Sequence, residues 1–207
     1  NRFGSTNEIG VFQMSSAGLE EVKNPSEIFL SERPQDVSGS VVVSILEGSR
    51  PLLVEIQSLV SKASFGYALR RTQGFDYNRL SLLIAVLEKS IGLQLESEDI
   101  FVNVAGGIKI EDPGADLGVA VAISSAFREQ IALSDAIFLG EVGLAGEIRS
   151  ISQATLRINE AEKLGFKHCL LPKNNFKNLD ILRKDSIELM PVSTLKEALD
   201  IATAKKI

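Results

Sequence analysis

Residues 116–128 constrain the fold of this 207-residue chain more than any other stretch. They are predicted to form one helix that is apolar nearly all the way round, from Asp116 through a run of Leu, Val, Ala and Ile to Arg128. A helix of this kind belongs in the interior of a protein, because none of its sides is suited to contact with water. We therefore expect it to lie at the centre of a domain, with other elements packed around it.

Patterns typical of strands and helices alternate from residue 37 onward, which predicts an α/β domain over residues 37–207. The expected strands are 41–46 and 52–60, joined as a hairpin, followed by 100–104, 137–140, 169–171 and 187–190. The expected helices are 77–91, 116–128, 154–164 and a last helix that begins near Thr194, which has capping-box spacing to Glu197. Asp76 is the expected N-cap of helix 77–91, and Gly92 is its expected end.

Residues 1–36 are predicted to form an arm. A strand-like run at 9–14 alternates apolar and polar residues, which suits a strand that completes a sheet elsewhere. Asn24-Pro25 and Arg33-Pro34 are typical of a connecting segment. The chain opens on Asn1 rather than methionine, so we expect it to be a piece of a longer protein.

Charge and cysteine content narrow the classes of ligand. The formal net charge of -5 gives no overall attraction to nucleic acid or to an anionic membrane, so phosphate binding would need a local basic patch. The single cysteine, Cys169, cannot form an internal disulfide or a cysteine-rich zinc site. We expect no structural metal, and no membrane as a partner, because no apolar stretch approaches 20 residues.

Three motifs occur in order along the chain. They are Asn1-Arg2-Phe3-Gly4 with Glu8-Ile9-Gly10-Val11-Phe12, then Arg70-Arg71-Thr72 with Gly74-Phe75-Asp76-Tyr77-Asn78-Arg79-Leu80, then Gly140-Glu141-Val142-Gly143-Leu144 with Gly146-Glu147. Together they resemble the RadA (Sms) family of bacterial DNA repair proteins, over essentially the whole chain. The resemblance implies a non-proteolytic scaffold and DNA-binding domain of a RecA-like, DNA-dependent ATPase and helicase that processes branched recombination intermediates.

The first motif resembles the end of that family's Lys-Asn-Arg-Phe-Gly sequence, which follows the ATPase core. The resemblance implies that Arg2 contacts the nucleotide of a neighbouring subunit in a homo-hexamer. It also implies ATP with Mg and a zinc finger in a preceding part of the protein, and no cofactor in this chain, which has no Walker-type sequence. The implied partners are single-stranded or branched DNA and the RecA recombinase. The implied compartment is the bacterial cytoplasm, or an organelle of bacterial origin.

Residues from about 37 onward resemble the proteolytic domain of Lon, which implies a Lon-type (ribosomal protein S5 domain 2-like) α/β fold. Lon uses a serine nucleophile and a lysine base. In this chain, Asp116 in Gly114-Ala115-Asp116-Leu117-Gly118 stands where Lon has the serine, and Thr155 stands where it has the lysine. We therefore expect no catalytic residues, and we expect the Asp116 carboxylate to cap the first amides of its helix.

The segment 62–79 carries a local charge of +3, from Lys62 and three arginines less one aspartate. Arg70, Arg71 and Arg79 are the candidate DNA-binding residues, and we expect all three to line one surface. Lys109, just before the former catalytic loop, is a further candidate. The alternative is that these are ordinary solvated cations, because short basic clusters are common on protein surfaces.

Two other functions remain open from the sequence. One is an active Lon-type Ser-Lys peptidase, which would require serine at 116 and lysine at 155. The other is a module that binds a protein partner without direct DNA contact. His168 and Cys169 are not expected to form a catalytic pair, because adjacent residues of a strand point to opposite faces. Ser124 and Ser125 are expected to be small packing residues of a buried helix.

Overall fold

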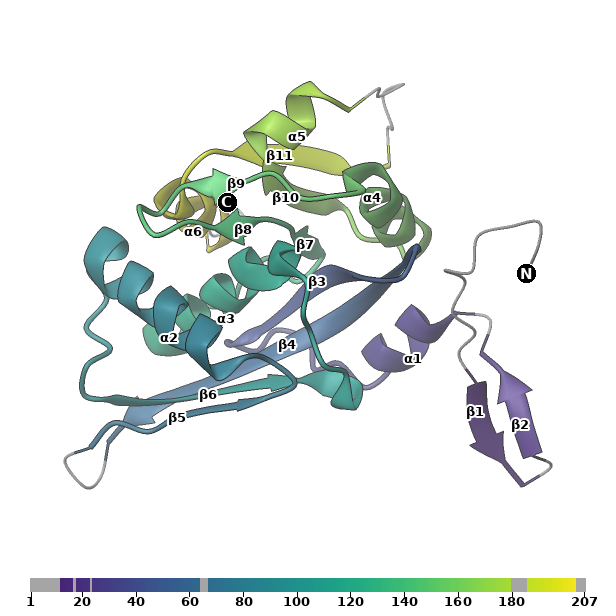
Figure 1. The fold of residues 1–207 in the computed structure, drawn as a ribbon, viewed down its shortest axis with the longest axis horizontal. Helices are drawn as coiled ribbons and strands as arrows, with labels where there is room; N and C mark the ends of the chain where they lie inside the picture. Colours follow the sequence, from purple (N-terminus) through teal and green to yellow (C-terminus); the bar gives the residue numbers. More distant parts are fainter. Residues whose placement is uncertain (1–11, 17, 23, 64–66, 180–185, 204–207) are drawn as a thin grey trace.

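The computed structural model describes residues 12–16, 18–22, 24–63, 67–179 and 186–203. Its main feature is a seven-stranded sheet with the order β11-β10-β7-β3-β4-β6-β5 (Figure 1). The strands are β3 (Ser40–Glu47), β4 (Arg50–Lys62), β5 (Arg70–Gln73), β6 (Glu98–Val104), β7 (Ala136–Phe138), β10 (His168–Pro172) and β11 (Glu188–Val192). The α/β class predicted from the sequence is confirmed.

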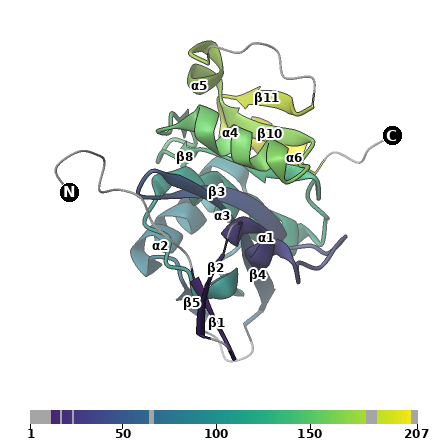
Figure 2. The same cartoon turned by 90° about the vertical axis from the view of Figure 1, so that its right-hand side faces the viewer.

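The sheet has an antiparallel half and a parallel half. β3 and β4 form the predicted hairpin, and β6 pairs antiparallel to β4 from Ile56 to Lys62. This second partner explains why β4 extends beyond the predicted end at residue 60. β5 pairs parallel to β6, while β7, β10 and β11 run parallel to β3. Figure 2 shows the parallel strands β10 and β11 on one side of β3, and β4 and β5 on the other.

Helices cover both faces of the sheet. They are α1 (Pro25–Leu30), α2 (Tyr77–Val86), α3 (Asp116–Arg128), α4 (Ala154–Lys163), α5 (Lys173–Lys177) and α6 (Leu195–Ala202). α2, α3 and α6 pack on the face that carries Val41 and Val43, and α4 packs on the face that carries Val42. Every residue of α3 from Asp116 to Ser125 is buried, which confirms the predicted central helix.

α2 begins and continues as predicted, with one local difference. The Asp76 side chain accepts a hydrogen bond from the backbone N–H of Arg79, so it is the N-cap, and Gly92 ends the element in the left-handed region at φ 81°. The last turn, Leu87–Ile91, is a π-helix rather than a continuation of the α-helix. Hydrophobic spacing does not distinguish these two helix types over a single turn.

The described part of the predicted arm forms a hairpin and a helix. β1 (Phe12–Ser15) pairs with β2 (Gly18–Glu21) in a hairpin of its own, rather than with a strand of the main sheet. The following helix α1 packs against β4, and the buried hydroxyl of Ser26 accepts a hydrogen bond from the Leu53 N–H and donates one to Glu160. Residues before the predicted boundary at 36 are therefore packed onto the domain.

Gly118 sets how closely α3 approaches the sheet. A Cβ atom built at this position would overlap Cγ1 of Val43 on β3. Any larger residue would force the helix away from the strand or Val43 out of its place. Because Asp116 lies two residues before Gly118 in the same helix, this close contact also fixes the position of Asp116 relative to β3.

Substitution Gly118→Ala should therefore destabilise the chain by about 1–3 kcal/mol, as overpacking does in a core. Helix propensity alone would instead stabilise the alanine variant by about 1 kcal/mol. The sign of the change in unfolding free energy therefore shows whether overpacking or helix propensity dominates. Urea unfolding of G118A, V43A and the double variant provides the measurement. We expect G118A to cost much less in the V43A background, and an equal cost in both backgrounds would contradict the contact.

Candidate functional site

Asp116 lies at the start of α3, and its side chain makes an ion pair with Arg79 of α2. The Arg79 Nε lies 2.6 Å from Oδ1 of Asp116, and Arg79 Nη2 donates to Oδ2 at 2.9 Å. The backbone N–H of Val142, on β8 (Glu141–Val142), donates to the same Oδ2 at 3.3 Å. Asp116 is 3% exposed, so a buried carboxylate joins three elements that are distant in sequence.

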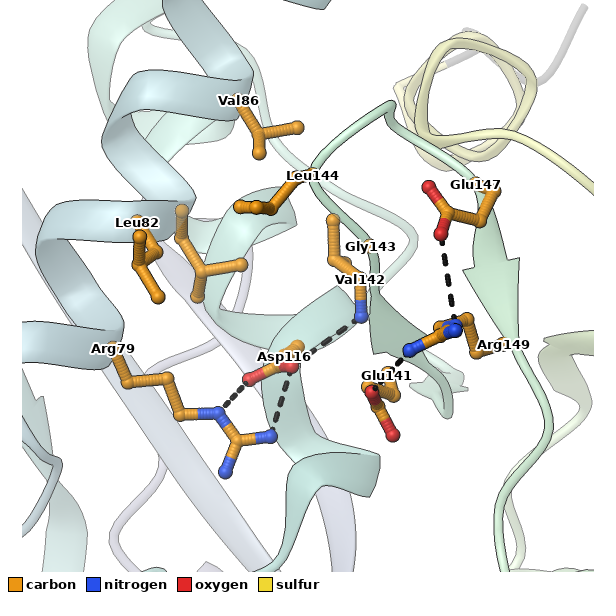
Figure 3. Close-up of a pocket in the computed structure, with 11 residues that line it drawn as sticks. Arg79, Leu82, Val86, Asp116, Glu141, Val142, Gly143, Leu144, Glu147 and Arg149 are labelled. Atoms are coloured by element: carbon orange, nitrogen blue, oxygen red, sulfur yellow. Dashed lines mark hydrogen bonds and ion pairs between the residues drawn. The ribbon is translucent and has the colours of Figure 1, made fainter.

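The expected capping role of Asp116 is wrong. α3 has no side-chain cap, and the carboxylate points to Arg79 rather than to the first amides of its own helix (Figure 3). A fully charged guanidinium makes a stronger partner than a backbone N–H, which accounts for this orientation. The capping residue is Asp112 instead. Its side chain accepts a hydrogen bond from the Gly114 N–H in the short 3-10 turn that precedes α3.

Burial raises the pKa of Asp116 to about 6, and the hydrogen bond from Arg79 and its positive charge oppose the rise. The carboxylate is consequently ionised at neutral pH, and it is already bonded to Arg79 and the Val142 N–H. Neither a nucleophile nor a free general base is left at this position. The position that the resemblance aligns with the Lon serine therefore carries a carboxylate that is bonded within the fold.

Thr155, which the resemblance aligns with the lysine of Lon, lies in the first turn of α4 and is exposed. Two residues later Arg157 is fully buried, with Nη2 2.6 Å from Oδ2 of Asp112 and Nε 3.0 Å from the Ser152 carbonyl. Arg157 also donates to the carbonyl of Ser44 on β3. It ties α4 to the turn that precedes Asp116.

Arg157 was not among the residues expected from the sequence, although the sequence carries a signal for it. The buried positions of α4 are Ala154, Arg157, Ile158 and Ala161, a spacing that puts the arginine on the apolar face. A charged residue at such a position requires a buried partner, because an unpaired charge in the interior is costly. The partner, Asp112, cannot be identified from spacing alone.

A hollow of about 440 Å³ opens above the ion pair. Figure 3 shows Arg79 and Asp116 at its base, with Leu82 and Val86 of α2 on one side and Leu144 opposite them. None of the residues that line it is a serine, threonine, cysteine, histidine or lysine. The hollow thus combines apolar surface with an ion pair at its base.

The three candidate arginines do not line one surface, which corrects the prediction. Arg70 and Arg71 are neighbours on β5, so their side chains lie on opposite faces of the sheet. Arg70 donates to the carbonyls of Leu95 and Glu98 on the helix-covered face. Arg79 is paired with Asp116, and Arg71 is the exposed member of the three. The sequence patterns did not predict strand β5, and without that strand the two arginines could not be assigned to opposite faces.

The remaining candidate cations have different surroundings. Lys109 is 77% exposed and its Nζ lies 2.7 Å from Oε1 of Glu111, a bond that raises the pKa of the lysine. Its charge is thereby locally balanced. Arg2 lies outside the described residues.

His168 and Cys169 do not form a pair, as predicted. The Nδ1 of His168 lies 3.0 Å from Oδ1 of Asp135, whereas Cys169 is buried in the apolar cluster with Ile158. Burial raises the pKa of the Cys169 thiol. Ser125 is bonded to the Gly39 N–H and the Gln130 carbonyl, which makes it a structural residue.

The described part of the chain offers no cluster of three or more histidine, cysteine, aspartate or glutamate side chains that could hold a metal ion. None of its helices has the length and apolar character needed to cross a membrane.

Comparison with known proteins shows two kinds of similarity. A family model described as subunit ChlI of Mg-chelatase matches residues 81–175. The chain is 50% identical over 205 residues to the DNA repair protein RadA of Halalkalibacterium halodurans, which covers 99% of the chain and 44% of that protein. It is 50% identical to RadA of Listeria monocytogenes, covering 96% of the chain and 43% of the relative. It is 48% identical to RadA of Streptococcus pneumoniae, covering 96% of the chain and 47% of that protein. The chain thus spans less than half the length of these relatives.

The raised pKa of Asp116 makes a prediction about pH. The folded-state pKa of about 6 exceeds the ordinary aspartate pKa of 3.8, so the Asp116 carboxyl stabilises the folded state below pH 4. This contribution is lost as the pH rises through 6. The variant Asp116→Asn lacks the titration. The stability of the wild type relative to D116N should therefore fall between pH 4 and pH 7, by about 3 kcal/mol at most.

Urea unfolding of both proteins at several pH values measures this difference, and other titrating groups cancel in the comparison. The control is Asp99→Asn. The Asp99 carboxylate accepts a hydrogen bond from the Leu69 N–H, and this bond is exposed rather than buried. A stability difference between wild type and D116N that does not vary with pH would contradict the burial argument.

Proposed function

The chain is homologous over nearly its whole length to proteins named DNA repair protein RadA, and from this premise we propose that it is a non-proteolytic Lon-type domain that serves as a scaffold and contacts DNA. The relatives are DNA repair proteins by name, and the chain shares about half of its residues with them. The proposal assigns the domain a role in DNA repair that does not depend on peptide cleavage.

The observation that carries the non-proteolytic part is the ion pair at Asp116. A Ser-Lys peptidase needs a hydroxyl that attacks and a neutral amine that takes its proton. Here a carboxylate held by Arg79 occupies the first position, and an exposed threonine occupies the second. The alternative function of an active Lon-type peptidase has no support in this geometry.

Arg71 is the best-supported DNA contact among the candidate residues. It is exposed on the side of β5 and β6 opposite to the one that carries Arg70, beside Gln57, Gln73 and Asn103, in a hollow of about 480 Å³. Uncharged amides and an exposed guanidinium suit contact with phosphate and sugar groups without sequence specificity. Arg70 and Arg79 are engaged within the fold, so we assign them a secondary role.

For the longer protein, we propose a homo-hexameric, DNA-dependent ATPase and helicase with ATP, Mg and a zinc finger in the part that this chain does not include. Branched recombination intermediates are its proposed substrates, and RecA is a proposed partner. The bacterial cytoplasm is the proposed compartment. The names of the relatives support the role in DNA repair.

The purified chain should neither cleave casein nor react with serine-directed fluorophosphonates. Mass spectrometry of the treated protein checks the second point directly. We expect no added mass on any serine, with an active Lon protease as the positive control. Stoichiometric labelling of one serine would overturn the non-proteolytic assignment.

Arg71→Ala should weaken DNA binding by the full-length protein at all sequences and make the binding less dependent on salt. Loss of one phosphate contact lowers the slope of log affinity against log salt by about 0.7–0.9. A DNA-binding titration at several salt concentrations gives the slope. Lys196→Ala, at an exposed lysine on α6, is the charge-matched control. An unchanged slope for R71A, with folding intact, would remove Arg71 from the interface.

A further inference from the structure

The strands β4, β6 and β5 lie side by side at one end of the sheet and carry two rows of side chains on one face (Figure 1). The register of the strands aligns three amides in one row, and a leucine, a phenylalanine and an arginine in the next: Gln57–Asn103–Gln73 and Leu59–Phe101–Arg71. Neighbouring strands are about 4.8 Å apart and the two rows about 7 Å apart. These six side chains, the amide-aromatic face, all line the hollow of about 480 Å³.

The hollow has a net positive lining. Arg71 is exposed, and none of the described residues that line the hollow is acidic. Asp99, two residues before Phe101 on β6, accepts a hydrogen bond from the Leu69 N–H and does not line the hollow. The lining therefore complements an anionic ligand.

Phe101 offers an aromatic surface at the centre of this face. It is half-buried on the middle strand, between Leu59, which is 62% exposed, and Arg71. An aromatic ring stacks with any nucleobase, because every base has a flat π face. In a duplex the neighbouring base pairs cover that face of the base, so only an unpaired base is available to such a ring.

A buried carboxyl group fixes the orientation of the amide row. Glu55 is 2% exposed, and its Oε1 accepts from the Ser40 hydroxyl at 2.6 Å. Its Oε2 accepts from Nε2 of Gln57 at 3.1 Å, which leaves Oε1 of Gln57 to accept from Nδ2 of Asn103 at 3.0 Å. Among the described residues, no hydrogen bond uses Oδ1 of Asn103. The Asn103 amide thus keeps an acceptor and a second N–H for a ligand.

We propose that the amide-aromatic face is a subsite for one unpaired base of a DNA strand. The base stacks on Phe101, its hydrogen-bonding edge meets the Asn103 amide, and an adjacent phosphate lies at Arg71. Every base has donors or acceptors on the edge that pairing would otherwise occupy, so an amide with both kinds of group accepts them without strong preference. The inference rests on the proposed DNA contact at Arg71 and adds recognition of the base to it.

The test is a fluorescence anisotropy titration of the whole chain at low salt with a labelled twelve-residue oligothymidylate. The matched ligand is an abasic strand of the same length and the same phosphate charge. We expect the oligothymidylate to bind at least about fivefold more tightly, which is the effect of one stacked base. No saturable binding of the oligothymidylate, or equal binding of the two strands, would overturn the proposal.

The variant Phe101→Leu locates the stacking contact. It keeps an apolar side chain in the sheet but removes the flat ring, so it should weaken binding of the oligothymidylate by about fivefold or more and leave the abasic strand unaffected. Asn103→Ala should change the two affinities in the same sense. The matched control is Phe176→Leu, at a phenylalanine that is 39% exposed on α5, beside β10 and β11 at the other end of the sheet. Equal weakening of both strands by F101L would indicate a structural role and contradict the stacking contact.

Arg71→Ala separates this proposal from the one on which it rests. If both strands bind the wild type equally and R71A weakens both, the phosphate contact stands and the base subsite is refuted. If R71A leaves the affinity for both strands unchanged, the Arg71 contact is refuted, and the subsite is refuted with it. We expect R71A to weaken both strands, and F101L to weaken only the strand that has bases.

Discussion

The ion pair between Arg79 and Asp116 is the interaction on which the arrangement of the candidate site depends. A carboxylate that is 3% exposed needs a partner of opposite charge, since removal of one member of a buried pair costs about 3–5 kcal/mol. Arg79 supplies that partner from α2, and the Val142 N–H adds a bond from β8. The pair therefore fixes α2, α3 and β8 relative to one another and forms the base of the hollow.

A second buried ion pair stabilises the segment of chain that precedes Asp116. Arg157 of α4 is fully buried against Asp112, and Asp112 also caps the turn that leads into Asp116. The start of α4 is held by this contact, while Thr155, which the resemblance to Lon aligns with a lysine, is exposed. The packing of α4 therefore depends on Arg157 rather than on the side chain at position 155.

The parts of the fold that follow from local patterns were predictable. The apolar character of α3, the Asp76 cap and the Gly92 end of the helix all depend on residues close in sequence, and the structure confirms them. The partner of Asp116 was not predictable, because Arg79 comes from an element 37 residues away and tertiary contact alone brings the two together. The separation of Arg70 from Arg71 followed from strand periodicity, but β5 is only Arg70–Gln73, too short to show that periodicity.

A double-mutant cycle on Arg79→Ala and Asp116→Ala, measured by urea unfolding at pH 7.5, tests the central role of this pair most directly. We predict that each single variant is destabilised and that the double variant is more stable than the sum of the two effects implies, with a coupling energy of about 1.5 kcal/mol or more. Effects that add to within about 0.5 kcal/mol would show that the two side chains act independently, which would contradict the account.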